Sequence, residues 1–276
     1  MAISNFIPTI WSENLITSLD KKYVGVANCN RDYEGEIKNK GAIVKICGVG
    51  KINVNDYTKD SDMSSPQALS DTVQELCIDQ AKFFNFQIDD VDRAQCSPKL
   101  MDLAMSGAAE SISEEADKYV YSLYGSAANS IRHTDISDGG LINTILKARK
   151  TLYQNNVSDS TEVVLEVSPA VAAAIMQEKI ATTHNSDLYE NGCIGSIAGC
   201  KIYVSNNIAS TSTSTTVTYK CFMRSKRAIA FAEQLSEINA YRPEKRFADA
   251  VKGLHLYGAK VVYPNELVVI EATEKL

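Results

Sequence analysis

Histidine and cysteine are the side chains of this sequence that could carry nucleophilic or metal chemistry. A cysteine nucleophile needs a histidine within reach to take its proton, and the histidines are His133, His184 and His255, none in a recognisable nucleophile motif. The seven cysteines include no C-x-x-C pair: Cys29, Cys47, Cys77, Cys96, Cys193, Cys200 and Cys221. We therefore expect free thiols in a reducing compartment, with neither a disulfide framework nor a zinc knuckle.

Three other groupings could hold a ligand, and each has a simpler structural interpretation. The gaps between His184, Cys193 and Cys200 fit no familiar zinc spacing. The acidic run 89–92 offers oxygen atoms to Ca²⁺ or Mg²⁺ but lacks a glycine-centred loop with a distal glutamate. The glycine-rich stretch 192–199 matches neither a dinucleotide fingerprint nor a P-loop, which favours a tight turn. No catalytic, cofactor-binding or metal-ligating residue is predicted, and no cofactor.

The composition is that of a globular protein. The chain has 276 residues, 45% hydrophobic and 22% charged, which predicts one large domain or two closely joined ones. Its apolar stretches are far shorter than the ~20 residues that cross a bilayer, so no membrane association is expected. Residues 1–8 lack the features of a signal peptide, which predicts that the protein stays in the cytoplasm where it is made.

The charge balance argues against a protein that wraps DNA. Lysine and arginine total 28 against 34 acidic residues, a formal net charge of −6. Such a chain lacks the cationic field that drives tight nucleic-acid binding, which leaves only weak, non-specific contact with DNA. The mixed-charge segment 242–246 is typical of a solvated surface. A long chain with a good core and no catalytic constellation favours a binding or structural protein over an enzyme.

The first part of the chain is predicted to form an arm, a hairpin and two strands. Trp11, Leu15 and Leu19 are spaced as on one side of a short helix. Two apolar runs flank Gly48-Val49-Gly50, which predicts a hairpin of 43–47 with 51–55. After a polar loop, 58–70, the alternation over 72–88 is too long for one ordinary strand and predicts two strands, or one strand that runs out of the body of the domain.

A long helix is expected next, followed by an α/β lobe. Ser97 and Pro98 can cap a helix that runs to Gly125 with one buried stripe from Leu100 to Leu123, which includes Leu103 and Gly107. The expected elements of the lobe are a helix capped by Ser137 and Asp138, a strand at 162–167, a helix from Ser168-Pro169 to 180, a strand at 201–205, a flexible Ser/Thr link at 210–216 and a strand at 217–223. The last fifty residues or so return to strands.

This order of elements resembles the major capsid protein of tailed bacteriophages, the Hong Kong ninety-seven type fold, across nearly the whole chain. The segments that carry the resemblance are 30–37, 41–46, 56–58, 78–92 with Gln95, 195–207 and 256–262. The first four and Gln95 look like the extended-loop region, 195–207 looks like the axial-domain segment before a core strand, and 256–262 looks like the closing peripheral strand.

The resemblance implies an α+β capsid fold with five parts. They are an N-terminal arm at 1–30, an extended β-hairpin loop at 31–80, a peripheral domain with the spine helix at 81–134, an α/β axial domain at 135–235 and a peripheral return at 236–276. Structural roles are expected for Trp11, Tyr33, Tyr57 and Phe84.

The function it implies is self-assembly, through hexamers and pentamers, into the icosahedral head shell that encloses double-stranded DNA. The shell would form in the host cytoplasm and become the virion capsid, with scaffolding, portal and decoration proteins as further partners. Two alternatives stay open: an encapsulin-like cargo shell of the same fold, and an α/β enzyme with an unrecognised site.

Overall fold

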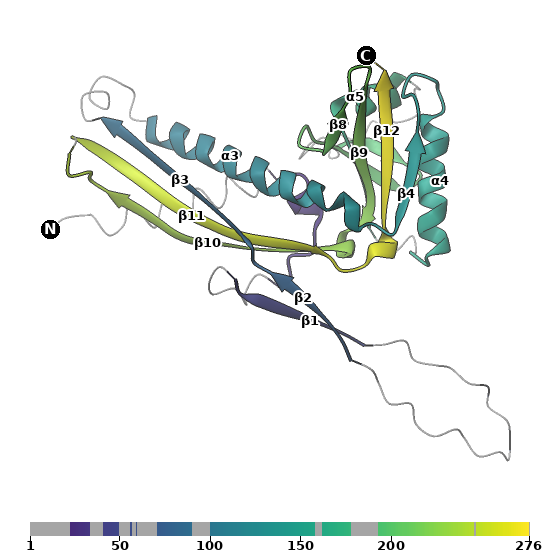
Figure 1. Ribbon diagram of the computed structural model, residues 1–276, viewed down its shortest axis with the longest axis horizontal. Coiled ribbons are helices and arrows are strands. Elements are labelled where there is room, and N and C mark those ends of the chain that lie inside the picture. Colours follow the sequence, from purple (N-terminus) through teal and green to yellow (C-terminus); the bar gives the residue numbers. More distant parts are fainter. Residues whose placement is uncertain are drawn as a thin grey trace.

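The computed structural model describes residues 23–33, 41–49, 56, 59, 71–89, 100–157, 162–177, 193–245 and 247–275. They form an elongated lobe, a compact lobe at one end of it, and a two-stranded ribbon that projects from the elongated lobe (Figure 1). The predicted arm helix, the strand at 51–55, Ser97, Trp11 and Tyr57 lie outside the described residues, as does the predicted loop 58–70 apart from Lys59.

In the elongated lobe, one long helix lies along a three-stranded antiparallel sheet of order β10-β11-β3 (Figure 1). Its elements are β3 Gln80–Asp89, α3 Leu100–Ser122, β10 Ile229–Tyr241 and β11 Ala248–Val261. The helix packs on the sheet because Met105, Ala109, Ile112, Ala116 and Val120 recur every three or four residues and are all buried.

The compact lobe is built on a seven-stranded mixed sheet of order β4-β12-β9-β5-β7-β6, with β8 paired to β9. Its elements are β4 Asn129–His133, α4 Leu141–Gln154, β5 Val163–Val167, α5 Pro169–Gln177, β6 Cys193–Ile197, β7 Cys200–Val204, β8 Ser210–Ser212, β9 Thr216–Ser225 and β12 Leu267–Lys275. β12 runs parallel to β4 and antiparallel to β9. The predicted division grouped 236–276 as a peripheral return, whereas hydrogen bonding places β12 inside this sheet.

Short 3-10 turns occur where the chain passes between parts of the molecule. They are η1 Val26–Asn28, η3 Leu123–Ser126, η6 Lys226–Ala228 and η7 Pro264–Glu266. The last three join α3 to β4, β9 to β10 and β11 to β12, so each carries the chain from one lobe to the other. The lobes are therefore connected by three chain crossings at one place.

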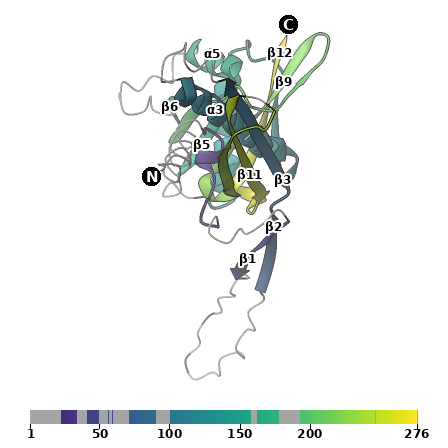
Figure 2. The ribbon, with the colours of Figure 1, turned by 90° about the vertical axis from the view of Figure 1, so that its left-hand side faces the viewer.

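The ribbon consists of β1 Ile43–Val49 and β2 Asp71–Cys77, paired antiparallel. Its root is buried because four apolar side chains pack on Ala230, Ala232 and Leu256 of the elongated lobe. These four are Val44, Ile46, Leu76 and Ile78. Beyond this root the ribbon extends away from both lobes, as the turned view shows (Figure 2).

The predicted hairpin is wrong in its partner and its turn. Gly48 and Val49 continue β1, and the strand that pairs with β1 is β2, whose Asp71 lies opposite Val49. Alternation of apolar residues identified the strand but could not identify a partner so distant in sequence. The split of 72–88 into two strands is confirmed by β2 and β3.

The predicted stripe of the long helix is correct near its end and wrong near its beginning. Leu103 is 68% exposed, and Gly107 is exposed, with nothing within 4 Å of a Cβ placed there. Met105 and Ala109 are buried instead. Small and apolar residues occupy both sides of this half of the helix, so periodicity could not decide which side faces the sheet.

Of the two helix beginnings predicted in the compact lobe, one is confirmed and the other is wrong. The Ser168 hydroxyl accepts a hydrogen bond from the Val171 amide at 3.4 Å, which confirms the predicted cap of α5. In α4 the N-cap is Gly140, so the cap predicted at Ser137 and Asp138 is wrong by about one turn. The Asp138 carboxylate instead accepts from the Gly140 amide in the preceding turn. The predicted Ser/Thr link contains a short strand, β8.

Candidate assembly site and the lobe junction

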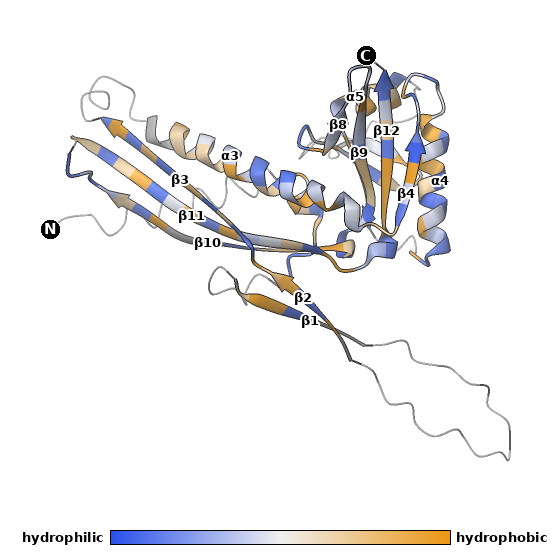
Figure 3. Cartoon of the chain, viewed as in Figure 1, coloured by the Kyte–Doolittle hydropathy of each residue, from blue (hydrophilic) through white to orange (hydrophobic). Residues whose placement is uncertain are grey.

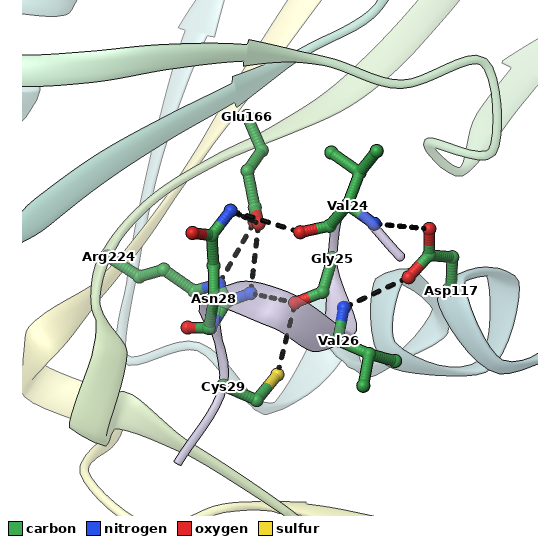
Figure 4. Close-up of polar contacts among 8 residues, drawn as sticks. All are labelled: Val24, Gly25, Val26, Asn28, Cys29, Asp117, Glu166 and Arg224. Carbon is green, nitrogen blue, oxygen red and sulfur yellow. Dashed lines mark hydrogen bonds and ion pairs between the residues drawn. The ribbon is translucent and has the colours of Figure 1, made fainter. Parts of the chain in front are cut away.

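A fully buried arginine lies where the two lobes meet (Figure 4). Arg224 ends the apolar part of β9, and its Nε and Nη2 each donate to one carboxylate oxygen of Glu166 on β5 at 3.0 Å. Its Nη2 also donates to the Gly25 carbonyl at 2.8 Å, and its Nη1 to the Asn28 carbonyl at 2.7 Å. One guanidinium thus neutralises Glu166 and holds the backbone of residues 23–31, here called the junction segment.

The same segment is held from the other side by Asp117 of α3 (Figure 4). The carboxylate accepts from the Val26 amide at 2.9 Å and the Val24 amide at 3.1 Å. Burial raises the pKa of Asp117 to about 6, although these amide hydrogen bonds lower it. Gly25 lies between the two amides, where a Cβ would lie 2.9 Å from the Tyr121 ring. Only glycine therefore fits this close approach without a shift of the ring.

A second carboxylate holds the ends of the junction segment to β10. Glu233 accepts from the Tyr23 hydroxyl and from Arg31, both at 2.6 Å, and its other close partner is Nε2 of His255 at 2.8 Å. Burial raises the pKa of Glu233, but these partners outweigh burial and hold it below the ordinary value. The Asn30 backbone pairs with Ala230 at the start of β10. The junction segment is thus hydrogen-bonded to both lobes. Because these polar groups are occupied by one another, the arrangement indicates that they stabilise the fold.

The elongated lobe and the ribbon expose large apolar side chains. Phe83 on β3 is 79% exposed, Phe247 before β11 is 84% exposed and Leu103 on α3 is 68% exposed. Ile43 and Val73 are also exposed on the ribbon. Apolar residues alternate with polar ones along β3 and β11 (Figure 3). Exposed large apolar side chains such as these lose their contact with water when a partner covers them, which is favourable.

The residues considered for catalysis do not come together. His133 lies in the compact lobe, 3.3 Å from Asp138, whereas His255 lies in the elongated lobe. Burial raises the thiol pKa of Cys29 to about 11 and of Cys221 to about 12, the opposite of what a nucleophile needs.

The remaining candidates have structural positions or lie outside the described residues. Residues 193–200 form the β6–β7 hairpin, whose turn residues Ala198 and Gly199 both have positive φ, so the tight-turn interpretation is confirmed. Asp89 ends β3, while 90–92 and His184 lie outside the described residues, as does Cys96. Within the described ranges, no three His, Cys, Asp or Glu side chains form a metal-binding group. No helix described there is both long and apolar enough to span a membrane.

Comparison with known proteins identifies the fold. No protein-family model and no curated protein matches the sequence. Among solved structures, the chain is similar to one from Mycobacterium phage Che8, with 28% identity over 90% of each chain and a TM-score of 0.69. It is also similar to the capsid structure of the cyanophage P-SCSP1u, with 13% identity, 89% and 86% coverage and a TM-score of 0.67. A virus-like particle from Pyrococcus furiosus matches at 11% identity, 96% and 99% coverage and a TM-score of 0.56.

The chain has the tailed-phage capsid fold. The α+β capsid architecture expected from the sequence is confirmed, including its long helix and a mixed sheet. In the capsid fold, Tyr33 packs against the ribbon root and Phe84 lies over Gly253 of β11, both structural positions.

The polar lobe junction of this capsid fold was not predicted from the sequence. Asp117, Glu166, Arg224 and Glu233 were not singled out, although a signal was present for two of them. Glu166 interrupts an otherwise apolar strand and Arg224 follows the apolar run of β9. A charge within a buried strand needs a partner, so these two could have been paired.

Proposed function

We propose that this chain is a major capsid protein that self-assembles into the icosahedral head shell enclosing viral double-stranded DNA. The observation that carries this proposal is the similarity over about nine tenths of the chain to capsid structures of tailed phages. The similarity also covers 86 to 91% of the matched chains, so most of the length of each matched protein is included. The chain is then a structural protein of the virion capsid, without enzymatic activity.

The surface of the isolated subunit supports self-association. The ribbon is two-stranded, and two strands are at most marginally stable alone in water. It also exposes Ile43 and Val73, while the elongated lobe exposes Phe83 and Phe247. Covering such groups in a neighbouring copy removes apolar surface from water. Assembly is therefore the state in which these parts of the chain become stable.

Finer features of the shell belong to the same proposal. The subunits associate as hexamers and pentamers, the geometry that closes an icosahedral lattice, and the shell forms in the host cytoplasm. Scaffolding, portal and decoration proteins are its further partners. The five-part division from the N-terminal arm at 1–30 to the peripheral return at 236–276 is part of the same proposal, except that β12 belongs to the sheet of the compact lobe. A net charge of −6 suits a container that touches packaged DNA only weakly.

An encapsulin-like cargo shell is the second candidate, favoured by the similarity to the Pyrococcus furiosus virus-like particle. Both candidates predict closed shells, but they differ in content. A capsid is expected to enclose DNA in infected cells, whereas a cargo shell is expected to copurify with an enclosed protein. Nuclease-protected nucleic acid and mass spectrometry of purified particles distinguish the two.

Assembly of the purified chain tests the proposal. The protein is expressed alone and with any scaffolding partner encoded beside it, then analysed by sedimentation velocity and electron microscopy. Closed, regular shells are expected. A monodisperse monomer at high concentration, across pH and ionic strength and with the scaffolding partner present, would contradict the proposal.

A further inference from the structure

We propose that the lobe junction contains a pH-sensitive contact, in which Asp117 of α3 takes up a proton and releases the Val24 amide at the start of the junction segment. The contact lies within one subunit, so the inference goes beyond the proposed function and does not depend on it. Its effect is to make the hold of the elongated lobe on this segment vary with pH.

The first observation is a buried carboxylate without a cation. Asp117 is 1% exposed, yet no lysine, arginine or histidine of the described residues forms an ion pair with it. Its Oδ1 accepts from the Val26 amide at 2.9 Å and its Oδ2 from the Val24 amide at 3.1 Å (Figure 4). A buried charge without a counterion favours proton uptake. Burial accordingly raises the pKa of Asp117 to about 6.

The other titratable groups around Asp117 are either paired or neutral. Glu166 of β5 adds a negative charge that raises the pKa of Asp117 further, but Glu166 itself is bound by Arg224 of β9. The guanidinium of Arg224 donates to Glu166 and to two backbone carbonyls, not to Asp117. Burial raises the pKa of the three nearby hydroxyl and thiol groups, which therefore stay neutral in mild acid: Tyr121, Tyr23 and Cys29.

The second observation is that the two amides differ in burial. Val26 is fully buried, so its amide would be left without a partner if Oδ1 took the proton, which is costly. Val24 is half-buried, and its longer hydrogen bond ends on Oδ2. A proton on Oδ2 turns this oxygen from an acceptor into a donor, and the Val24 amide can then bind water. Proton uptake therefore releases Val24 and retains Val26.

The release is local, because other contacts of the junction segment do not involve Asp117. Arg224 still binds two carbonyl groups of the segment, and Glu233 still holds both of its ends to β10. The subunit as a whole gains stability on proton uptake, since a buried charge is removed. Below about pH 6, α3 thus holds the segment by one amide instead of two.

Hydrogen exchange of single amides tests this contact. The purified protein is exchanged at pH 7 and pH 5 in the same assembly state, and each rate is divided by the intrinsic rate of that amide in an unfolded peptide. Between these values Asp117 passes from about one tenth to about nine tenths protonated. The protection of the Val24 amide is expected to fall at least fivefold at pH 5, while that of Val26 stays within twofold. Equal protection of Val24 at both pH values would overturn the inference.

Two variants separate Asp117 from other titrating groups. Asp117→Asn keeps an oxygen for the Val26 amide but turns an NH₂ group toward Val24, so Val24 is expected to exchange fast at both pH values. Asp135→Asn is the matched control, because Asp135 also accepts a backbone amide, that of Ser137, but has Lys275 as its cation. This control is expected to keep the wild-type pH dependence of Val24.

Each result decides for or against the inference. If Asp117→Asn keeps the pH dependence of Val24 exchange, or if Asp135→Asn loses it, Asp117 is not the group that takes up the proton and the inference fails. If Asp117→Asn does not fold, the comparison of Val24 with Val26 in the wild type decides alone. The measurement needs no shells, so failure of the proposed function would leave it unaffected.

Discussion

Arg224 and Glu166 form the most enclosed ion pair of the described residues, with no side-chain exposure on either partner. Taking two charges out of water is costly, and the cost is recovered here by bidentate geometry and by the two carbonyl groups that Arg224 also binds. Removing one partner leaves the other buried without compensation. The loss of subunit stability is therefore expected to be large when one partner of the pair is removed alone.

Arg224→Met is expected to lower the free energy of unfolding of the subunit by about 3–5 kcal/mol. The matched control is Lys201→Met, which breaks the ion pair of Lys201 with Glu162. The N–O distance of this pair is 2.7 Å, similar to that of the buried pair, but both of its side chains are more than 40% exposed. That change is expected to cost under about 1 kcal/mol. Denaturant unfolding of unassembled subunits measures both. The double variant Arg224→Met/Glu166→Leu should lose less than Arg224→Met alone, and a larger loss would contradict the account.

Asp117 makes subunit stability depend on pH. Its pKa in the folded protein is about 6, against an ordinary value of 3.8, so the folded state binds this proton more tightly than the unfolded chain does. Its contribution is therefore fully present below pH 3.8 and is lost as pH rises through 6. The stability of the wild type minus that of Asp117→Asn is expected to increase by about 1 kcal/mol from pH 7 to pH 5. Unfolding curves at both pH values check it, and a flat difference would contradict it.

At the scale of elements, the ribbon root depends on a glycine. Gly258 of β11 lies beneath the end of β2, where a Cβ would lie 2.2 Å from the Cys77 carbonyl oxygen. Backbone cannot swing aside as a flexible side chain can, so Gly258→Ala is expected to cost about 1–3 kcal/mol. Gly107→Ala, in open space on a helix, is expected to gain up to about 1 kcal/mol. Thermal melts of both variants test this. Equal melting temperatures would contradict the close contact between Gly258 and the backbone of Cys77.

Elements with strong local patterns were predictable, and their partners were not. Alternation divided 72–88 correctly into β2 and β3, and Ser168 marked the beginning of α5. The pairing of β1 with β2 and the face of α3 near Gly107 were missed, because both are decided by residues distant in sequence. The junction was missed for the same reason, since its charges come from α3, β5, β9 and β10 and meet only in the fold.

At the scale of the molecule, the lobes are firmly connected and the ribbon is not. Three chain crossings and the junction segment join the lobes, and Glu266 at the last crossing accepts hydrogen bonds from Ser225 and Arg227. Among the described residues, the apolar contacts that hold the ribbon to the body are those of its root. We therefore expect adjustments between subunits in a shell to occur in the ribbon first, with the lobes moving as a unit.

The position of β12 has a consequence for how the protein is made. This strand lies between β4 and β9 but is synthesised after both, and Ile270 pairs with Ile131, which precedes it by 139 residues (270 − 131). The compact lobe thus cannot close its sheet while the chain is still being translated through β11, and contacts so distant in sequence form slowly. Chains arrested on the ribosome should show protease resistance in 163–225 only once β12 has emerged. Resistance before that point would mean that the other strands hold a stable sheet without it.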